Sequence, residues 1–430
     1  MEKEQFDRLL LIRVVIGYLL VVVGVAIRPI MYIAAAYYLI TIVLSKKTEN
    51  IVCMLFAWLS ISTIFKFSVG GTSIFTYIEL IAIIKFMVID RKVGKRFLLL
   101  WMVYLIYLIV GMDTAYTDLI KTAIIPLLLF FMAKSLDYYK LKIVSFYYII
   151  GVIINSFLGY FKGHIPNMQQ YVVYKTQGVG YAASVLIRED RFSGLWVDPN
   201  YYSVHLILVI AICAVLFSRK EIKPIIFYSC FVLMTIFGAM TGSKSFVAML
   251  MVVTVLSLFL FLKNRVYQHA LFFSFIIIVG IVLLTSGYMD LFSKVVYRLQ
   301  NVSSSGITTG RTDIWKSYFN LWIEKPYLFL FGSGLGNGFL LRVPHNTFMD
   351  FIALLGVFGT GIFCSVMFFS LSEGFWDKKH GVALPLLTLG MLYFFLSVFQ
   401  SIEFVFQVLL VFGFFFLIPE ENNVVTGDYL

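Results

Sequence analysis

Long apolar runs alternate with short polar or charged breaks along the chain, and this pattern predicts a series of membrane-spanning helices. About 20 consecutive apolar residues in a helix cross the hydrocarbon core of a bilayer. Several runs are short for a perpendicular span, and one begins at Pro29 directly after the first run. We therefore expect about 12 to 14 spans. The candidate runs are 9–27, 29–44, 51–66, 74–89, 97–111, 119–133, 143–160, 200–218, 224–240, 245–262, 268–289, 346–369, 383–400 and 404–418.

The composition agrees with this interpretation and excludes a soluble domain. Hydrophobic residue types fill 61% of the 430 positions and charged residues only 13%, whereas a soluble protein is about 25% charged. The aromatic share of 18% suits lipid-facing surfaces and interfacial belts. The sequence therefore predicts an all-α, polytopic integral membrane protein.

The distribution of basic residues predicts the topology. Lys and Arg are enriched in the short cytoplasmic loops of membrane proteins. With a cytoplasmic N-terminus, the short outer loops contain only Arg28, Lys66 and Lys244, and both termini are cytoplasmic. A nucleic-acid partner is not expected despite the net charge of +11, because the chain lacks a soluble module with a basic face. The cations assigned to the cytoplasm are Lys3, Arg8, Lys46, Lys47, Arg91, Lys92, Lys95, Arg96, Lys134, Lys140, Lys142, Arg219, Lys220, Lys223, Lys263, Arg265, Lys378 and Lys379.

Two connections are far longer than the few residues that usually join helices. Both fall on the predicted outer side, and together they carry ten cations. These cations indicate either an anionic ligand outside the membrane or a generally solvated basic surface. The loops divide the chain into an N-terminal transmembrane bundle at 1–160, a first long extracytoplasmic loop at 161–199, central helices at 200–289, a second long extracytoplasmic loop at 290–345, and C-terminal helices with a cytoplasmic tail at 346–430.

The second long loop contains a predicted amphipathic helix. Apolar residues recur at helical spacing from Arg311 to Ile323, and Pro326 marks the end. Such a helix lies in the plane of the outer interface. The glycine-rich stretch 332–338 then predicts a flexible turn, whose spacing alone is weak evidence for phosphate binding because no βαβ unit surrounds it.

Polar residues also gather where the first long loop enters the next span. Asp198 and Asn200 flank a proline at a good helix start, so capping is one interpretation of both. Arg191 lies a few residues earlier and pairs either with an anion or with the acidic residues beside it. His205 lies about 7 Å below Asn200 at 1.5 Å per residue, and packing against a neighbouring helix is favoured for it over a place in the cavity.

Two further outer segments place a cation beside small residues. The turn 241–244 ends at Lys244, which either snorkels to lipid phosphate or contributes to a site. Arg311 follows Gly310 at the start of the amphipathic helix, where the helix amino end favours anions. Its guanidinium can also bind phosphate through two parallel hydrogen bonds.

His345 and Asn346 stand at the mouth of the run 346–369, and Gly356 and Gly359 follow them. A histidine with an ordinary pKa of about 6.5 can accept a proton near neutrality, although a lone interfacial histidine also serves in packing. The two glycines, three positions apart, can let a neighbouring helix approach closely.

The remaining ionisable and sulfur side chains do not indicate a metal site. Glu79 is expected to face the bundle interior, because a charge near mid-membrane is costly, and Lys85 is expected to snorkel toward the cytoplasm. No DxD, HExxH or paired-carboxylate motif occurs. The cysteines lie in apolar runs without CxxC spacing and are interpreted as small buried hydrophobes. They are Cys53, Cys213, Cys230 and Cys364.

Four motifs, taken in order, resemble those of the O-antigen polymerase and O-antigen ligase superfamily. They are R-x-S-G-x-x-x-D-P-N before a span, T-G-S-K at an outer turn, G-R-x-x-x-W in a long outer loop, and H-N-x(9)-G-x-x-G after it. The resemblance covers roughly residues 185–360. It implies a GT-C-type glycosyltransferase without metal or other cofactor, which uses undecaprenyl-pyrophosphate-linked glycans on the outer face of the bacterial cytoplasmic membrane.

The resemblance also implies roles for individual residues. His345 is the expected general base or acceptor-orienting residue. The family's Ser-Arg position is Ser243-Lys244 here, so the charge is kept and the planar fork is lost. The residues expected to bind pyrophosphate and substrate are Arg191, Arg311, Lys244, Asp198, Asn200 and Asn346.

A polymerase of O-antigen, capsule or exopolysaccharide is favoured over a ligase, because a chain rich in Ile, Phe and Lys suggests an AT-rich genome and a source without lipid A. The expected partners are an undecaprenyl-pyrophosphate-linked oligosaccharide, membrane lipids, and a chain-length regulator and flippase of the same pathway. A lipid-linked-glycan flippase is the alternative from another class, but it requires ionisable residues at the midplane of several helices. The aromatic residues expected to stack on sugars or to anchor at the interface are Trp196, Tyr201, Tyr202 and Trp315.

Overall fold

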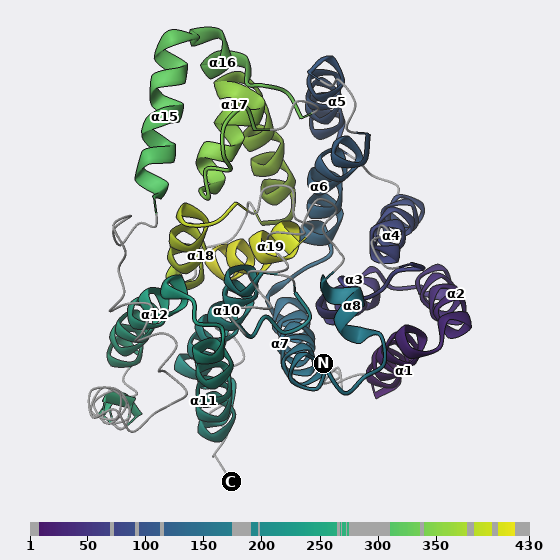
Figure 1. The fold of residues 1–430 in the computed structure, drawn as a ribbon. Helices are drawn as coiled ribbons and strands as arrows, with labels where there is room; N and C mark the ends of the chain where they lie inside the picture. Colours follow the sequence, from purple (N-terminus) through teal and green to yellow (C-terminus); the bar gives the residue numbers. More distant parts are fainter. Residues whose placement is uncertain are drawn as a thin grey trace.

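The computed structural model shows a chain built from helices and loops (Figure 1). The structure describes residues 8–68, 73–90, 94–111, 116–173, 191–196, 198–264, 267, 269–271, 273–274, 310–335, 339–375, 382–397 and 403–417. No β-strand occurs among these residues, so the predicted all-α class is confirmed. The helices are α1 Arg8–Ala26, α2 Arg28–Leu44, α3 Thr48–Trp58, the short 3₁₀ helix η1 Leu59–Ile61, α4 Ile74–Asp90, α5 Lys95–Val110, α6 Tyr116–Lys134, α7 Tyr138–Tyr160, α8 Met168–Val173, α10 Pro199–Ser218, α11 Pro224–Met240, α12 Lys244–Lys263, α15 Arg311–Glu324, α16 Pro326–Phe331, α17 Thr347–Phe375, α18 Leu384–Phe394 and α19 Glu403–Phe416.

Five of the described helices are long and apolar enough to cross a membrane, which confirms a polytopic membrane protein. They are α1, α7, α10, α12 and the Thr347–Ser372 part of α17. Shorter apolar helices accompany them. Every predicted run except 268–289 overlaps a described helix, and most of that run lies outside the described residues. The total of about 12 to 14 spans stays a prediction.

The helix α10 is buried along almost its whole length, because apolar side chains cover all of its faces. A helix of this kind needs neighbours or lipid on every side. It packs against α7, α11, α12 and α18, and Figure 1 shows α18 between these helices and the group formed by α15, α16 and α17. The start of α10 is therefore held in place by the surrounding bundle.

Backbone contacts dock the segment before α10 into the bundle. The N–H of Leu195 donates to Oδ1 of Asn155 at 3.1 Å, and the Leu195 carbonyl accepts from Oγ1 of Thr63 at 2.7 Å. Gly194 has a φ of +57°, and a Cβ there would meet Asn155 and Tyr202. Only glycine fits this turn without strain. The docked turn therefore fixes the position of the chain that leads into residues 198–200.

The helix α17 is interrupted at Gly356, whose φ of 65° and ψ of 179° are not helical. The expectation of one continuous span is therefore wrong at this position. The chain that leaves α16 fills the break, because the N–H groups of Ser333 and Gly334 donate to the carbonyls of Ala353 and Leu354 at 2.9 and 3.0 Å. These bonds satisfy carbonyls that the interruption removes from the helical ladder.

A tyrosine of α5 closes the same junction. The hydroxyl of Tyr107 lies 2.5 Å from the carbonyl oxygen of Leu355 and 3.0 Å from that of Phe331, so it donates to this pair. A Cβ at Gly359 would meet the Tyr107 ring, and one at Gly356 would meet the backbone at the end of α16. The predicted close approach at the two glycines is confirmed, and its partners are this ring and that backbone.

The helix α15 confirms the amphipathic helix predicted in the second long loop. Tyr318 and Trp322 are buried in a small apolar cluster, whereas Phe319 and Ile323 are exposed. The helix ends at Glu324, one residue from Ile323, and Pro326 begins the next helix, so Pro326 marks the stop as predicted. The predicted turn at 332–338 begins with the contacts of Ser333 and Gly334 described above, and residues 336–338 lie outside the described part of the chain.

The predicted burial of Glu79 and of three of the four cysteines is confirmed. Glu79 is 2% exposed. Nζ of Lys85 donates to the carbonyl of Val43 at 2.6 Å, and its snorkelling toward the cytoplasm stays a prediction. Cys364 is exposed, so its predicted burial is wrong, whereas the other three cysteines are buried. The exposed side of a spanning helix contacts acyl chains, and an apolar thiol needs no cover from protein there.

Candidate active site

Arg191 connects the start of α10 with the turn between α11 and α12. Its Nε donates to the carbonyl oxygen of Thr241 at 2.8 Å, and its Nη2 donates to Oδ1 of Asn200 at 3.2 Å. The N–H of Phe192 adds a bond to the carbonyl of Met240 at 3.1 Å. Arg191 thus joins the first two sequence motifs. The acidic residues considered as its alternative partners, at 189 and 190, lie outside the described residues.

The amide of Asn200 joins two helix starts. Its Oδ1 also accepts from Oγ of Ser243 at 2.9 Å, and its backbone N–H donates to Oδ1 of Asp198 at 2.7 Å. Asp198 therefore caps α10, as predicted, while Ser243 caps α12 directly before the half-buried Lys244. The first turn of each helix presents N–H groups and a partial positive charge, so the two starts together favour an anion.

His345 adopts a left-handed backbone conformation with a φ of 54°. Such a conformation is uncommon outside glycine, costs on the order of 1–3 kcal/mol, and is concentrated at functional sites. Contacts on both sides hold it in place. Nε1 of Trp315 donates to the carbonyl of Pro344 at 2.8 Å, and Oδ1 of Asn346 caps two N–H groups in the first turn of α17 at 3.0 and 3.1 Å. The His345 side chain itself is exposed.

Arg311, Asp198 and His345 lie close enough for their charges to act on one another. Desolvation by neighbouring residues lowers the pKa of His345, the positive charge of Arg311 lowers it further, and Asp198 opposes both effects. Desolvation also lowers the pKa of Arg311, which Asp198 raises, and the guanidinium stays protonated. His345 is therefore neutral at pH 7 and available to accept a proton.

A segment that the sequence did not single out contacts several elements of this site. Nη1 of Arg311 donates to the carbonyl of Phe395 at 2.7 Å, and Oγ1 of Thr347 donates to the carbonyl of Leu396 at 2.5 Å. No local pattern marks these contacts, because they join residues 84 and 49 positions apart.

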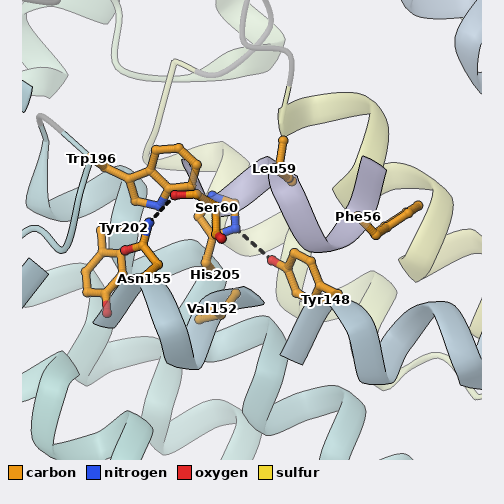
Figure 2. Close-up of a pocket in the computed structure, with 9 residues that line it drawn as sticks. All are labelled: Phe56, Leu59, Ser60, Tyr148, Val152, Asn155, Trp196, Tyr202 and His205. Atoms are coloured by element: carbon orange, nitrogen blue, oxygen red, sulfur yellow. Dashed lines mark hydrogen bonds between the residues drawn. The ribbon is translucent and has the colours of Figure 1, made fainter. Parts of the chain in front are cut away.

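The aromatic residues expected near the sugars are placed in two ways. Trp196 is buried and stacks on His205 with ring centroids 4.8 Å apart, and Tyr202 is buried with its hydroxyl 2.5 Å from that of Ser156. Figure 2 shows both among the residues that line one pocket. Sugar stacking and interfacial anchoring are therefore wrong for these two residues. Trp196 is carried inside by the docked turn before α10, and Tyr202 lies within α10, which is buried along most of its length. Tyr201 and Trp315 are half-buried and stay candidates.

The histidine of α10 is packed rather than exposed to the site, as favoured from the sequence. Nδ1 of His205 lies 2.8 Å from the hydroxyl of Tyr148, a bond drawn in Figure 2. Nε2 of His205 lies 3.5 Å from Nε2 of Gln407. This network ties α10 to α7 and α19.

Within the described part of the chain, no group of three or more His, Cys, Asp or Glu side chains could hold a metal ion. The arrangement instead combines a neutral histidine, arginines and adjacent helix starts. Such a set can take a proton from a hydroxyl and stabilise an anionic leaving group.

The fold defines an all-α, polytopic membrane protein in which a histidine and two arginines lie near helix starts. Residues 229–364 match the family described as O-antigen ligase. The match confirms the resemblance of the motifs and supports the O-antigen ligase and polymerase superfamily, whose members are bacterial membrane-bound enzymes that transfer glycans. It includes Lys244, Arg311 and His345, while the motif around Arg191 precedes it. No curated protein and no solved structure matches the chain.

Proposed function

We propose that this protein is a polysaccharide polymerase of the bacterial cytoplasmic membrane. It joins undecaprenyl-pyrophosphate-linked repeat units on the outer face by metal-independent glycosyl transfer. The observation that carries this proposal is that the charges of Arg311 and Asp198, which come from two other motifs, act on His345, while Asp198 caps the start of α10. A chain-length regulator and a flippase of the same pathway are the proposed protein partners.

The proposed reaction needs a base on one side and positive charge on the other. A hydroxyl oxygen of the acceptor glycan attacks the anomeric carbon of the donor, and the bond from that carbon to the pyrophosphate oxygen breaks. A ring nitrogen of His345 takes the hydroxyl proton, for which its neutral form is required. Arg311 and Lys244 offset the charge that develops on the departing pyrophosphate. Direct displacement of this kind inverts the anomeric centre.

The contacts of Arg191 support a second proposed role for it. Two of its guanidinium nitrogens hold Thr241 and Asn200, so it aligns the starts of α10 and α12 as well as contributing charge. A planar guanidinium does this better than an ammonium group, because its donors have fixed directions. Arg191 therefore supports pyrophosphate binding both through its charge and through the amides that it positions.

The ligase alternative shares this chemistry and differs only in the acceptor, and the matched family carries the ligase description. Composition favours the polymerase. A flippase is disfavoured because the cations of interest gather at helix starts beside a histidine, whereas transport sites lie among ionisable residues near mid-membrane.

The deciding experiment supplies purified protein in lipid nanodiscs with one defined lipid-linked repeat unit. A ladder of longer lipid-linked glycans supports the polymerase, and transfer only after a lipid A core acceptor is added supports the ligase. His345→Ala is the inactive control. Activity should persist in EDTA, and its loss there would contradict the metal-independent mechanism. If neither product forms while vesicles show movement of the intact lipid-linked unit across the bilayer, the flippase alternative replaces the proposal.

A further inference from the structure

Residues 395–397, which follow α18 and are called the strap below, accept hydrogen bonds from three other elements. The carbonyl of Phe395 accepts from Arg311 of α15, the carbonyl of Leu396 from Thr347 of α17, and the carbonyl of Ser397 from the hydroxyl of Tyr201 in α10. These carbonyls are available because the strap lies beyond the end of the helix. The strap thus ties together the three helices whose first residues form the proposed active site.

The side chain of the last strap residue makes a fourth contact. Oγ of Ser397 donates to Oδ1 of Asp350 at 3.0 Å. Asp350 is buried, with 2% of its surface exposed, and it lies one turn beyond Thr347 on α17. A buried carboxyl group needs hydrogen-bond partners, so losing the Ser397 hydroxyl would leave one of its oxygens without this partner at a cost in free energy.

We propose that Asp350 and Ser397 are positioning residues of the glycosyl transfer, which hold the strap so that Arg311 stays beside His345. Arg311 is the link. Its Nη1 bonds the carbonyl of Phe395, next to the Leu396 carbonyl that accepts from Thr347, two residues after His345. At this range its charge acts on His345. When the bond between Asp350 and Ser397 is lost, the strap carbonyls shift and Arg311 moves with them. The role in glycosyl transfer rests on the proposed function. The positioning of Arg311 by Asp350 and Ser397 does not depend on it.

The first test measures transfer. Ser397→Ala removes the Oγ donor and leaves the carbonyl, and it should lower kcat/KM on the order of tenfold, since small misplacements of catalytic groups are costly. Ser397→Thr keeps the donor and should restore most of the activity. Ser370→Ala is the matched control, because Ser370 is buried and its Oγ likewise donates to an acceptor on another helix, the carbonyl of Pro126 at 3.1 Å, away from the strap. Equal losses in Ser370→Ala and Ser397→Ala would overturn the proposal.

A double-mutant cycle separates positioning from general stability. In an Arg311→Lys background, adding Ser397→Ala should lower kcat/KM by less than about twofold further, since the effects of coupled residues are not additive in free energy. If the loss in the double variant equals the product of the two single losses, Ser397 does not act through Arg311. Asp350→Ala should reproduce Ser397→Ala, and Asp350→Asn, which keeps an acceptor oxygen, should be milder.

The second test needs no glycosyl transfer. Diethyl pyrocarbonate modifies the neutral imidazole, so its rate at the exposed His345, followed by mass spectrometry against pH, reports the pKa of that residue in the full-length protein. The charged groups that act on His345 are Arg311 and Asp198. Arg311→Ala should move the midpoint to higher pH, and Ser397→Ala should move it in the same direction.

The two tests fail independently. An upward shift in Ser397→Ala, in a protein that transfers no glycan, would reject the proposed function and keep the positioning of Arg311. A midpoint that moves in Arg311→Ala but not in Ser397→Ala would overturn the positioning claim, whatever the activity.

Discussion

Trp315 donates from Nε1 to the carbonyl oxygen of Pro344 at 2.8 Å, and the amphipathic helix α15 thereby fixes the backbone directly before His345. The Trp315 ring also meets Phe394 edge-on, with centroids 5.2 Å apart. His345 has a left-handed φ of 54°, and a conformation of this kind persists only where its surroundings impose it. Trp315 is one of the residues that impose it.

Trp315→Phe should therefore slow transfer without unfolding the protein. The variant keeps a ring against Phe394 and loses only the N–H donor, so the strained backbone at His345 relaxes and kcat falls about tenfold. Trp101→Phe is the control, because Nε1 of Trp101 donates to the carbonyl of Ala123 at 2.9 Å, between α5 and α6. Turnover assays of both purified variants should show a loss in Trp315→Phe alone, and comparable losses would mean a general effect on packing.

His345→Ala should abolish transfer while insertion and folding persist. General acid–base groups contribute about 10²- to 10⁴-fold, and the exposed His345 side chain supplies little packing.

The wild-type kcat/KM should be constant above the lowered pKa of His345 and fall as the pH drops through it, because the base is then protonated. Arg311→Ala removes a charge that lowers this pKa, so its acid limb should lie at higher pH. Near-normal turnover in His345→Ala would remove the histidine from the mechanism.

How far the sequence predicted the molecule depended on the distance over which each signal acts. Apolar runs and helix-stop residues are local, so α15 and most of the spans from α1 to α12 were predicted close to their actual ends. The run 51–66 was too long, because α3 ends at Trp58, and the short helix α8 was not predicted within the loop 161–199. The cap at Asp198 is also local and was predicted. The break at Gly356 was missed because a Gly-x-x-Gly pair reads equally as a helix contact, and only the chain after α16 determines which geometry forms.

The candidate site was predicted as a set of residues but not as an arrangement. Spacing placed Arg191, Arg311 and His345 at the ends of elements, yet their neighbours come from the tertiary fold. The contact of Arg311 with Phe395 spans 84 positions, and the left-handed backbone of His345 follows from contacts with α15. Asp350 was overlooked because one carboxylate in the first turn of a helix reads as an ordinary favourable charge there.

The cations should separate by role. Arg191→Ala should raise the donor KM and lower kcat, with kcat/KM falling about 10- to 100-fold, as expected for a charge-assisted hydrogen bond worth about 1.5–3 kcal/mol. Arg191→Lys should rescue only in part. Lys244→Arg should be tolerated and Lys244→Ala impaired. Lys325, exposed at the end of α15, is the negative control. A loss in Lys325→Ala as large as that in Arg191→Ala would mean that the cations act as a diffuse basic surface.

The predicted topology can be read by labelling, independently of activity. Ser304 and Lys379, both outside the described residues, belong to the second long loop and to a cytoplasmic loop in the predicted arrangement. Each is replaced by cysteine in a protein whose native cysteines are changed to alanine, since Cys364 is exposed. A membrane-impermeant maleimide applied to intact cells should label Ser304→Cys and spare Lys379→Cys. Labelling of Lys379→Cys from outside would invert the topology and place the site in the cytoplasm.

Gly356→Ala should destabilise the junction between α16 and α17. The φ of 65° and ψ of 179° at Gly356 belong to a region that is essentially restricted to glycine, so a side chain there costs on the order of 1–3 kcal/mol. A Cβ would also meet the backbone of Leu330 and Phe331, which cannot move aside as a flexible side chain does.

Gly361→Ala is a matched control five positions further along the same helix, where a Cβ meets nothing within 4 Å. There the change should be neutral or favourable by up to about 1 kcal/mol, because alanine is the better helix former. Thermal unfolding in detergent should therefore show a lower Tm for Gly356→Ala and an unchanged or higher Tm for Gly361→Ala. Equal Tm values would mean that α17 runs unbroken through Gly356 and that the chain after α16 does not bind there.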